Sequence, residues 1–200
     1  MNVDKVIIRT ILTTFLSVVA LISFMFIALI CCFPQTMMRI TYDMGMESSS
    51  IYFAEDAYKR TDDVGYIAYA TEVAILDDNG EKIIKCGEKL IKDDGFTRYC
   101  QDKDEQMQIE TSYEQYVYGQ ICVAMYNKGE KQQAIDRAFM LIGNAFPRNN
   151  AVLAVLVAAS RAQDTQSLDM IKGKMNELQG KELDDAAKAE IENILTQLEK

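Results

Sequence analysis

The chain has 200 residues and a formal net charge of −9, with neither histidine nor tryptophan. Without histidine, the commonest general base and metal ligand of proteins is missing. Asp4, Lys5 and Arg9 are the charged residues before position 34, which leaves 19 basic and 29 acidic residues beyond it. This acidic excess argues against a nucleic-acid partner, because phosphate binding draws on clustered lysine and arginine. It should also hold the chain beyond position 34 away from an anionic lipid surface.

The first predicted element is an apolar run over residues 7–33, which Pro34 ends. At about 1.5 Å of rise per residue, a helix of this length crosses a hydrocarbon core of about 30 Å. The residues just before Pro34 are too bulky for a signal-peptidase site, so the sequence predicts an uncleaved transmembrane helix. Cleavage, or lipidation at Cys31 or Cys32, is the alternative.

The charges around this run predict its orientation. Residues 1–6 form a short N-terminal segment that carries two positive charges, on Lys5 and the free amine. Arg9 adds a third positive charge shortly after it. Short positive flanks tend to remain in the cytoplasm. We therefore expect a single-pass protein of the cytoplasmic membrane, with the N-terminus inside and residues 34–200 outside the cytoplasm.

A helical hairpin is predicted in the middle of the chain. A helix-like run from Tyr113 to Lys128 is followed by Gly129, a second helical pattern begins near Ala134, and Pro147 prevents its continuation. The expected buried positions are Tyr118, Ile121, Cys122 and Met125 in the first helix and Ala134 and Ala138 in the second.

This segment resembles a tetratricopeptide repeat, a unit of about 34 residues made of two antiparallel helices. Gly129, Ala134, Ala138 and Pro147 match the turn, the two close-approach positions and the terminator of that family. The resemblance covers residues 35–180 and implies a right-handed solenoid of stacked hairpins, in which the first helix of each unit lines a concave binding surface. A generic array of helical hairpins is the alternative.

Stepping along the chain by this period predicts where the other units lie. Gly45 and Asn79 are one period apart, whereas Asn79 and Gly129 are fifty residues apart, one period plus sixteen. The excess coincides with a polar stretch at residues 93–111, which we interpret as an insertion. The predicted organisation is a terminal segment at 1–6, a transmembrane anchor at 7–33, about four hairpins at 34–180 and a C-terminal capping helix at 181–200.

Local signals place further helices. Thr111 with Glu114, and Asp78 with Glu81, are spaced as capping boxes that open helices. Residues 151–159 are apolar on all sides, which predicts a helix covered on both faces. In the last helix, Leu183, Ala187, Ile191, Ile194, Leu195 and Leu198 should face inward, and Glu182, Asp185, Glu192 and Glu199 outward.

No motif for catalysis, cofactor binding or metal binding is present. The acidic run at residues 77–80 lacks the later oxygen ligands of a calcium loop, so it is read as a turn between helices. Cys86, Cys100 and Cys122 are too widely spaced for a zinc knuckle. Free buried thiols are expected, with one disulfide among the three as the alternative. We therefore predict no catalytic residues, no cofactor, no metal site and no enzymatic activity.

The leading functional hypothesis is a membrane-anchored scaffold for a protein or peptide partner. The first helices of the third and fourth units would present Tyr116, Val123, Tyr126, Asn127 and Arg161 to the concave surface. Tyrosine and arginine are frequent at binding hot spots, although ordinary helix packing is the alternative for these positions. The layout is also similar to that of bacterial envelope accessory proteins, which implies chaperone-like work or the organisation of a membrane complex.

A second hypothesis is a subunit that its complex holds mainly through the transmembrane helix. Thr10, Thr13, Thr14 and Ser17 place small polar groups along the first half of the apolar run. Such residues let membrane helices approach closely and share hydrogen bonds.

Overall fold

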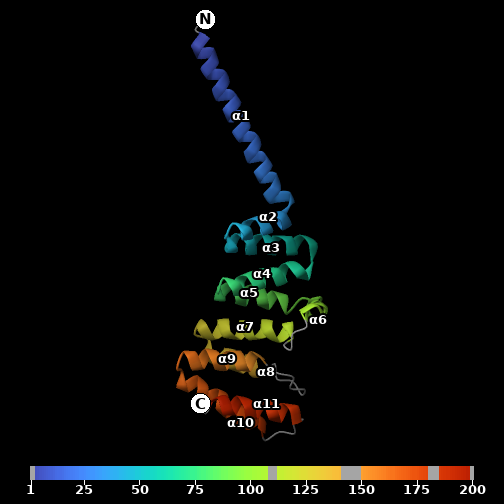
Figure 1. Cartoon of the computed structure of the whole chain (residues 1–200), viewed down its shortest axis with the longest axis vertical. Helices are drawn as coiled ribbons and strands as arrows, with labels where there is room; N and C mark the ends of the chain where they lie inside the picture. Colours follow the sequence, from blue (N-terminus) through green and yellow to red (C-terminus); the bar gives the residue numbers. More distant parts are fainter. Residues whose placement is uncertain (1–2, 108–111, 141–149, 180–184, 199–200) are drawn as a thin grey trace. The chain divides into compact units, whose positions relative to one another are not determined.

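The computed structural model describes residues 3–107, 112–140, 150–179 and 185–198 (Figure 1). Over these residues every regular element is a helix and no strand is present, which confirms the predicted all-α class. The right-handed solenoid stays a prediction. By its packing the chain divides into two compact units, Met1–Asp62 and Asp63–Lys200, whereas the sequence-based division falls after residue 33.

The first unit begins with the long helix α1 (Val3–Cys32). Within the described ranges it is the helix long and apolar enough to cross a membrane, over the 26 residues Ile7–Cys32. Phe33 leaves the helical conformation, with φ −132° and ψ 61°, and Pro34 opens α2 (Pro34–Asp43). Proline lacks the N–H that would extend α1, but its fixed φ suits the first turn of a new helix.

Helices α2 and α3 (Glu47–Thr61) pack against each other as a hairpin. Gly45 makes the turn with φ +69°, a conformation that side chains other than glycine rarely adopt. Ser50, where the repeat pattern has alanine, is fully buried and donates from its hydroxyl to the carbonyl oxygen of Met38 at 2.8 Å. This hydrogen bond explains how a polar residue fits the close-approach position.

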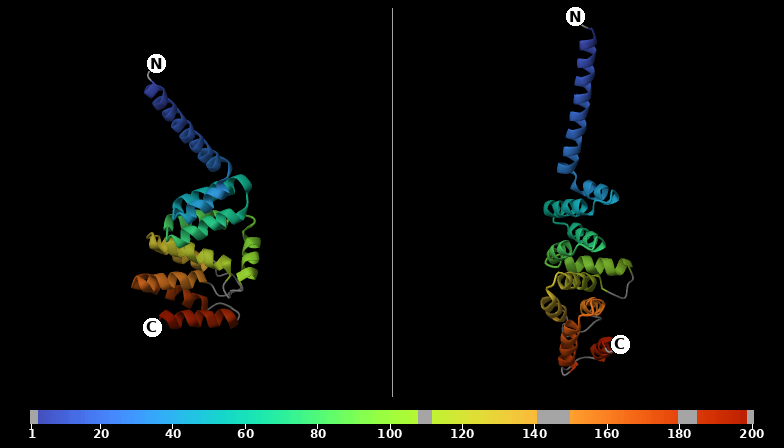
Figure 2. Two further views of the ribbon diagram at one scale, coloured as in Figure 1. Left: turned by 45° about the horizontal axis from the view of Figure 1, so that its top comes forward. Right: turned by 90° about the vertical axis from the view of Figure 1, so that its left-hand side faces the viewer.

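The second unit stacks helices in layers in chain order, from α4 and α5 to α10 and α11, in both views of Figure 2. Neighbouring helices along the chain pack as pairs, α4 with α5, α7 with α8 and α9 with α10. The elements are α4 (Val64–Leu76), α5 (Gly80–Leu90), α6 (Phe96–Met107), α7 (Tyr113–Asn127), α8 (Lys131–Met140), α9 (Asn150–Arg161), α10 (Thr165–Gln179) and α11 (Asp185–Leu198).

The α7–α8 hairpin lies where the sequence predicts it. Gly129 makes the turn with φ +97°, and Ala134 and Ala138 are buried at the contact with α7. Of the predicted stripe on α7, Ile121, Cys122 and Met125 are buried, and Tyr118 is partly exposed. The proposed terminator Pro147 lies outside the described residues.

Both predicted capping boxes are displaced by one residue. The side chain of Ser112, not Thr111, accepts a hydrogen bond from the backbone of α7, and Thr111 lies outside the described residues. At α5 the cap is Asn79, whose side chain accepts from the backbone N–H of Lys82 at 3.2 Å. Asp78 takes a left-handed conformation with φ +49° and completes the turn between α4 and α5. Residues 77–79 therefore form the predicted turn between helices.

Most of the predicted polar insertion at 93–111 is a helix. α6 buries Phe96 and Cys100 and packs on α4 and α7. It runs across the edge of the stacked layers instead of joining them (Figure 2, left). Its buried apolar residues lie in the first turns, whereas its second half is mostly polar. The composition of the segment alone therefore does not predict a packed helix.

The prediction that residues 151–159 are covered on both faces is wrong. One face of α9 is buried through residues such as Val152, Val155 and Ala159, but Val157 is 43% exposed. Leu153 and Ala154 are also partly exposed. Because helices α7, α8 and α10 pack against α9 from a limited range of directions, an apolar side is left open.

Burial of the cysteines agrees with the predicted free thiols. Cys86, Cys100 and Cys122 are buried and form no disulfide with one another. Burial raises the pKa of the Cys122 thiol to about 11 and that of Cys100 to about 12. In α11, Ile194 is fully buried while Asp185 and Glu192 are exposed, as the capping-helix prediction requires of them. Leu183, Glu182 and Glu199, and the side chains of the other predicted inward residues, lie outside the described part of the chain.

Candidate interaction surface

One face of α7 combines several residues that the surrounding helices leave accessible. Tyr116, Gln120, Val123 and Asn127 follow each other at spacings of four, three and four residues. Since successive helical residues turn by roughly 100°, these positions fall on one side of the helix. Tyr116 and Asn127 are exposed, and Gln120 and Val123 are partly so. Three of the five predicted partner-binding residues therefore share this face.

A hollow of about 460 Å³ lies between this face and the start of α5. Gln120, Val123 and Asn127 form its α7 side, and Asp78 and Glu81 stand on the opposite side with Ile83. Lys128 lies at its edge. The start of α5 lies close to α7, since a Cβ added at Gly80 would be in ordinary van der Waals contact with Ala124, at 3.9 Å.

A second hollow of about 430 Å³ lies between α7 and α9. Gln120 and Val123 also line this hollow, so the two hollows are neighbours along α7. Its other side is the open face of α9, made of Leu153, Ala154, Val157, Ala158 and Arg161. Arg161, predicted from the sequence as a groove residue, is thus brought beside Val123. We call the two neighbouring hollows together the α7 groove.

The α7 groove has an uneven distribution of charge. Asp78 and Glu81 are exposed at the α5 end, and the exposed Arg161 lies at the α9 end. Between them, the polar Gln120 and Asn127 share the α7 side with Val123, and the α9 side is apolar. Among the described residues, no ion pair engages Asp78, Glu81 or Arg161. Lys128 instead pairs with Glu130 at 3.2 Å. The groove therefore offers a negative end, a middle that is apolar around Val123 and α9, and a positive end.

Tyr126 does not lie in this groove, although the sequence prediction placed it there. It is 2% exposed, and its hydroxyl donates a hydrogen bond to Oδ2 of Asp164 at 2.7 Å. Tyr126 is one residue before Asn127, so it is rotated by roughly 100° from the open face of α7. The structure therefore gives Tyr126 a packing role between the α7–α8 pair and the α9–α10 pair.

Asp164 is the centre of this inter-hairpin contact. Its Oδ2 also accepts from Nζ of Lys131 and from the hydroxyl of Ser167, at 2.7 and 2.8 Å. The backbone N–H of Ser167 donates to Oδ1, which caps the start of α10. The hydrogen bond from Lys131, followed by those from Tyr126 and Ser167, lowers the pKa of the Asp164 carboxyl well below its usual range. These contacts fix α9 and α10 relative to α7.

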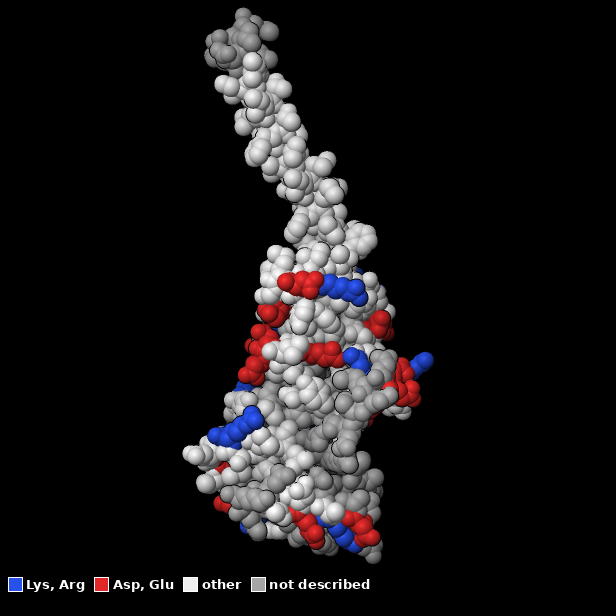
Figure 3. All heavy atoms as spheres, viewed as in Figure 1, with Lys and Arg blue, Asp and Glu red and all other residues white. Residues whose placement is uncertain are grey.

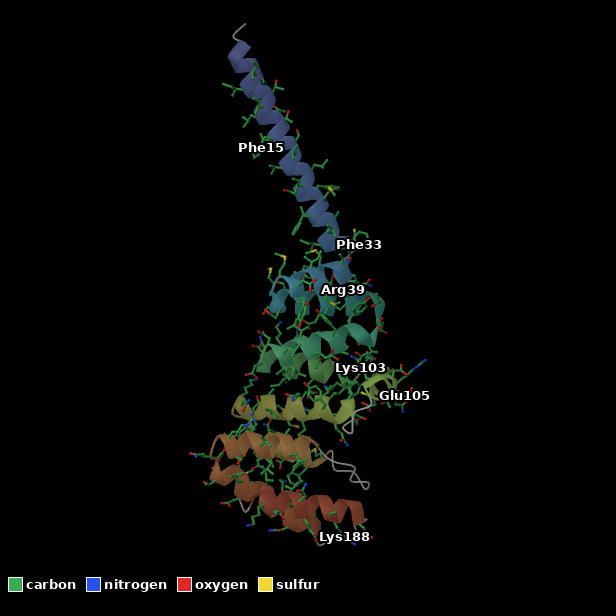
Figure 4. All side chains as sticks on the ribbon, viewed as in Figure 1. Phe15, Phe33, Arg39, Lys103, Glu105 and Lys188 are labelled. Carbon is green, nitrogen blue, oxygen red and sulfur yellow. The ribbon has the colours of Figure 1, made fainter. Side chains whose placement is uncertain are left out.

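A polar cluster fixes α6 to α4 and α7. Oε1 of Glu72 accepts hydrogen bonds from the Tyr113 hydroxyl at 2.8 Å and from Nζ of Lys103 at 3.3 Å. The carboxylate of Asp104 accepts from the backbone N–H of Tyr113 at 2.7 Å. Figure 4 labels Lys103 on α6. Burial, and then the charge of Glu72, raises the pKa of the Tyr113 phenol above its usual range, so Tyr113 acts here as a hydrogen-bond donor.

Sequence reasoning missed Gln120 and the open face of α9. Gln120 could have been predicted, because it lies one helical turn after Tyr116 and one before Val123. Nothing in the sequence marks which side of the apolar run at residues 151–159 is open. In the described part of the chain, no three side chains of the metal-ligating types come together as a metal site.

Compared with protein-family models, with curated protein sequences and with solved structures, the chain has no significant match in any of the three.

Proposed function

We propose that this protein is a membrane-anchored interaction scaffold that binds a segment of a partner protein in the α7 groove. The observation that carries the proposal is the open apolar face of α9, with Val157 43% exposed, opposite the accessible face of α7. Exposed apolar surface rimmed by polar groups is typical of sites that bind proteins or peptides. Tyr116 lines neither hollow, but it is exposed one helical turn before Gln120 on the same face of α7, and tyrosine is common at hot spots.

The charge distribution defines the segment that fits. An apolar side chain would lie over Val123 and Val157, a basic residue would face Asp78 and Glu81, and an acidic residue or a terminal carboxylate would pair with Arg161. Such complementarity orients a bound peptide, because the reversed peptide places like charges together. The role is non-enzymatic and needs neither a cofactor nor nucleic acid.

The anchor of this scaffold is α1. Its predominantly apolar segment Ile7–Cys32, 26 residues long, has the length that a bilayer span requires. In the proposed arrangement the N-terminus is cytoplasmic and residues 34–200 lie outside the cytoplasmic membrane. An accessory or chaperone-like factor of a bacterial envelope complex would have this layout.

Site-specific photo-crosslinking in the native host tests the proposal. The full-length protein carries a photoreactive amino acid at Val157 in the groove or, as the matched control, at Leu76, which is 74% exposed outside it. The proposal expects a discrete protein adduct from Val157 that Arg161→Glu weakens, with an apolar residue beside an acidic one in the crosslinked peptide. Groove binding would be refuted if Leu76 gave as much adduct as Val157, or if Arg161→Glu left the Val157 adduct unchanged.

A subunit held through its membrane helix is the second candidate. In α1, Thr13 donates from its hydroxyl to the carbonyl oxygen of Arg9 at 2.7 Å, a bond within the helix that gives no evidence of a partner helix. Exchanging residues 7–33 for an unrelated transmembrane span separates the two candidates. The scaffold should keep the Val157 adduct after the exchange, whereas a subunit held by its anchor should lose its complex.

A further inference from the structure

The first hairpin presents an apolar stripe on α2 that no other described element covers. Phe33, Ile40 and Met44 are 57%, 41% and 67% exposed. Ile40 and Met44 lie one helical turn apart on one side of α2, and Phe33 stands at the junction directly before the helix. Met37 belongs to the same face but is buried, within a helix that packs against α1. The stripe therefore borders the buried side of α2, and its first residue, Phe33, directly follows the last residue of α1.

The backbone leaves little freedom between this stripe and the proposed transmembrane helix. Phe33 still donates its N–H to the carbonyl oxygen of Leu29 at 2.9 Å, and α2 begins at the next residue. The guanidinium of Arg60, at the end of α3, donates to the carbonyl oxygen of Cys31. Both helices of the hairpin are thus tied to the last turn of α1, so the hairpin stays where α1 ends.

The surface of this unit shows the same continuity. On the face drawn in Figure 3, the uncharged surface of α1 extends onto the first hairpin before charged side chains begin. In Figure 4 sulfur atoms stand on the side of α2 toward α1, and Phe33 is labelled at the junction. Arg39 and Asp43 are exposed beside the stripe, which makes α2 amphipathic.

We propose that the apolar stripe of α2 lies in the interface of the same bilayer that α1 spans, with Phe33, Ile40 and Met44 at the boundary between headgroups and acyl chains. This inference rests on the proposed membrane anchoring and is independent of groove binding. Amphipathic helices bind membranes by burying such a face about 5–10 Å below the headgroups. A helix that starts directly at the end of a transmembrane span is already at that depth. The remaining acidic chain is repelled from anionic lipid and keeps out of the bilayer.

Because the natural chain contains no tryptophan, single substitutions create unambiguous fluorescent reporters. Three full-length variants are reconstituted in liposomes: Met44→Trp reports on the stripe, Phe15→Trp on the middle of α1, and Leu76→Trp on an exposed site of the second unit. All three positions are exposed, so circular dichroism should show unchanged helix content. Each is measured with lipids brominated on the acyl chains and with the aqueous quencher acrylamide.

The inference expects Phe15→Trp to lose most of its emission in brominated lipid, Met44→Trp to lose part of it, and Leu76→Trp to lose none. Acrylamide should quench in the reverse order. If Phe15→Trp is quenched by lipid but Met44→Trp behaves like Leu76→Trp, the interfacial hairpin is refuted and the anchor stands. Blue-shifted Met44→Trp emission without lipid quenching means that protein covers the stripe, which also refutes it. If Phe15→Trp escapes lipid quenching, the anchor and the inference fall together.

Discussion

The two sides of α7 carry similar apolar residues, but on one side they are buried and on the other they remain accessible. On one side, Ile121 is fully buried against Gly87 in the middle of α5, where a Cβ would stand 2.7 Å from its side chain. On the other side, Val123 lines both hollows and lies opposite Val157 in the second. Both sides carry β-branched apolar residues in the same helix. The comparison teaches that an apolar side chain in this unit becomes core or binding surface according to how closely the next helix approaches.

The largest expected effect tests the closed side. Gly87→Ala should destabilise the protein by about 1–3 kcal/mol, because the added methyl group overpacks the contact with Ile121. The measurement is urea unfolding of the full-length protein in detergent, followed by the helical circular dichroism signal. The contrast between the two sides of α7 would lose its basis if the variant were as stable as the natural protein.

Gly173→Ala is the matched control for that substitution. Gly173 lies within α10, and a Cβ built there meets no atom within 4 Å. Alanine should stabilise the helix by up to about 1 kcal/mol, because glycine is the poorer helix former. Opposite signs for the two glycine substitutions would show that packing, and not helix propensity, sets the effect at Gly87.

A smaller effect is expected at the contact that holds the groove together. Tyr126→Phe removes the hydrogen bond to Asp164 and should cost about 0.5–1.5 kcal/mol of unfolding free energy. Tyr116→Phe, on the accessible face of the same helix, is the control and should leave stability unchanged. Equal effects from the two would contradict the packing role assigned to Tyr126.

The pH dependence of stability tests the same contact through the charge of Asp164. The pKa of Asp164 is lower in the folded protein than in the unfolded chain, so the ionised carboxylate stabilises the fold. This contribution is complete above the unfolded pKa of about 3.9 and is lost as the pH falls through the lower folded value. Asp164→Asn should be less stable at neutral pH and should show a flatter acid limb in an unfolding titration. If the stability of the natural protein and that of Asp164→Asn fell in parallel as the pH was lowered, the stabilising role of the Asp164 carboxylate would be contradicted.

The smallest stability effect is expected on the open side. Val157→Glu should change the unfolding free energy by no more than about 0.5 kcal/mol, because the side chain already faces solvent. It should nevertheless abolish adducts from a photoreactive group at Val123, since it puts a charge in the apolar middle of the groove. A strongly destabilised Val157→Glu protein would mean that the α9 face belongs to the core.

Much of the fold was predictable because its signals are local. Gly45 and Gly129 occupy turns with positive φ, and Pro34 separates α1 from α2 at the expected residue. The capping residues were predicted within one position, since Thr111 and Ser112 are both good caps and only the final path of the chain selects between them. The helix α6 escaped prediction because it packs on α4 and α7 through contacts that the local sequence does not show, such as that of Lys103 with Glu72, 31 residues away.

The candidate site was predictable only in part. The helical period placed Tyr116, Val123 and Asn127 on one face, and the repeat phase placed Arg161 near them. The same reasoning put Tyr126 in the groove, because the sequence does not show that Asp164, 38 residues away, binds its hydroxyl.

The sequence by itself determined the helical class, the long apolar first helix and the positions of the tight turns, since these follow from side-chain hydropathy and from the backbone freedom of glycine and proline. Tertiary structure alone decided which sides of α7, α9 and α2 are covered. Coverage depends on the approach of helices that are distant in sequence, and an apolar side chain has the same local preferences whether or not another helix arrives to bury it.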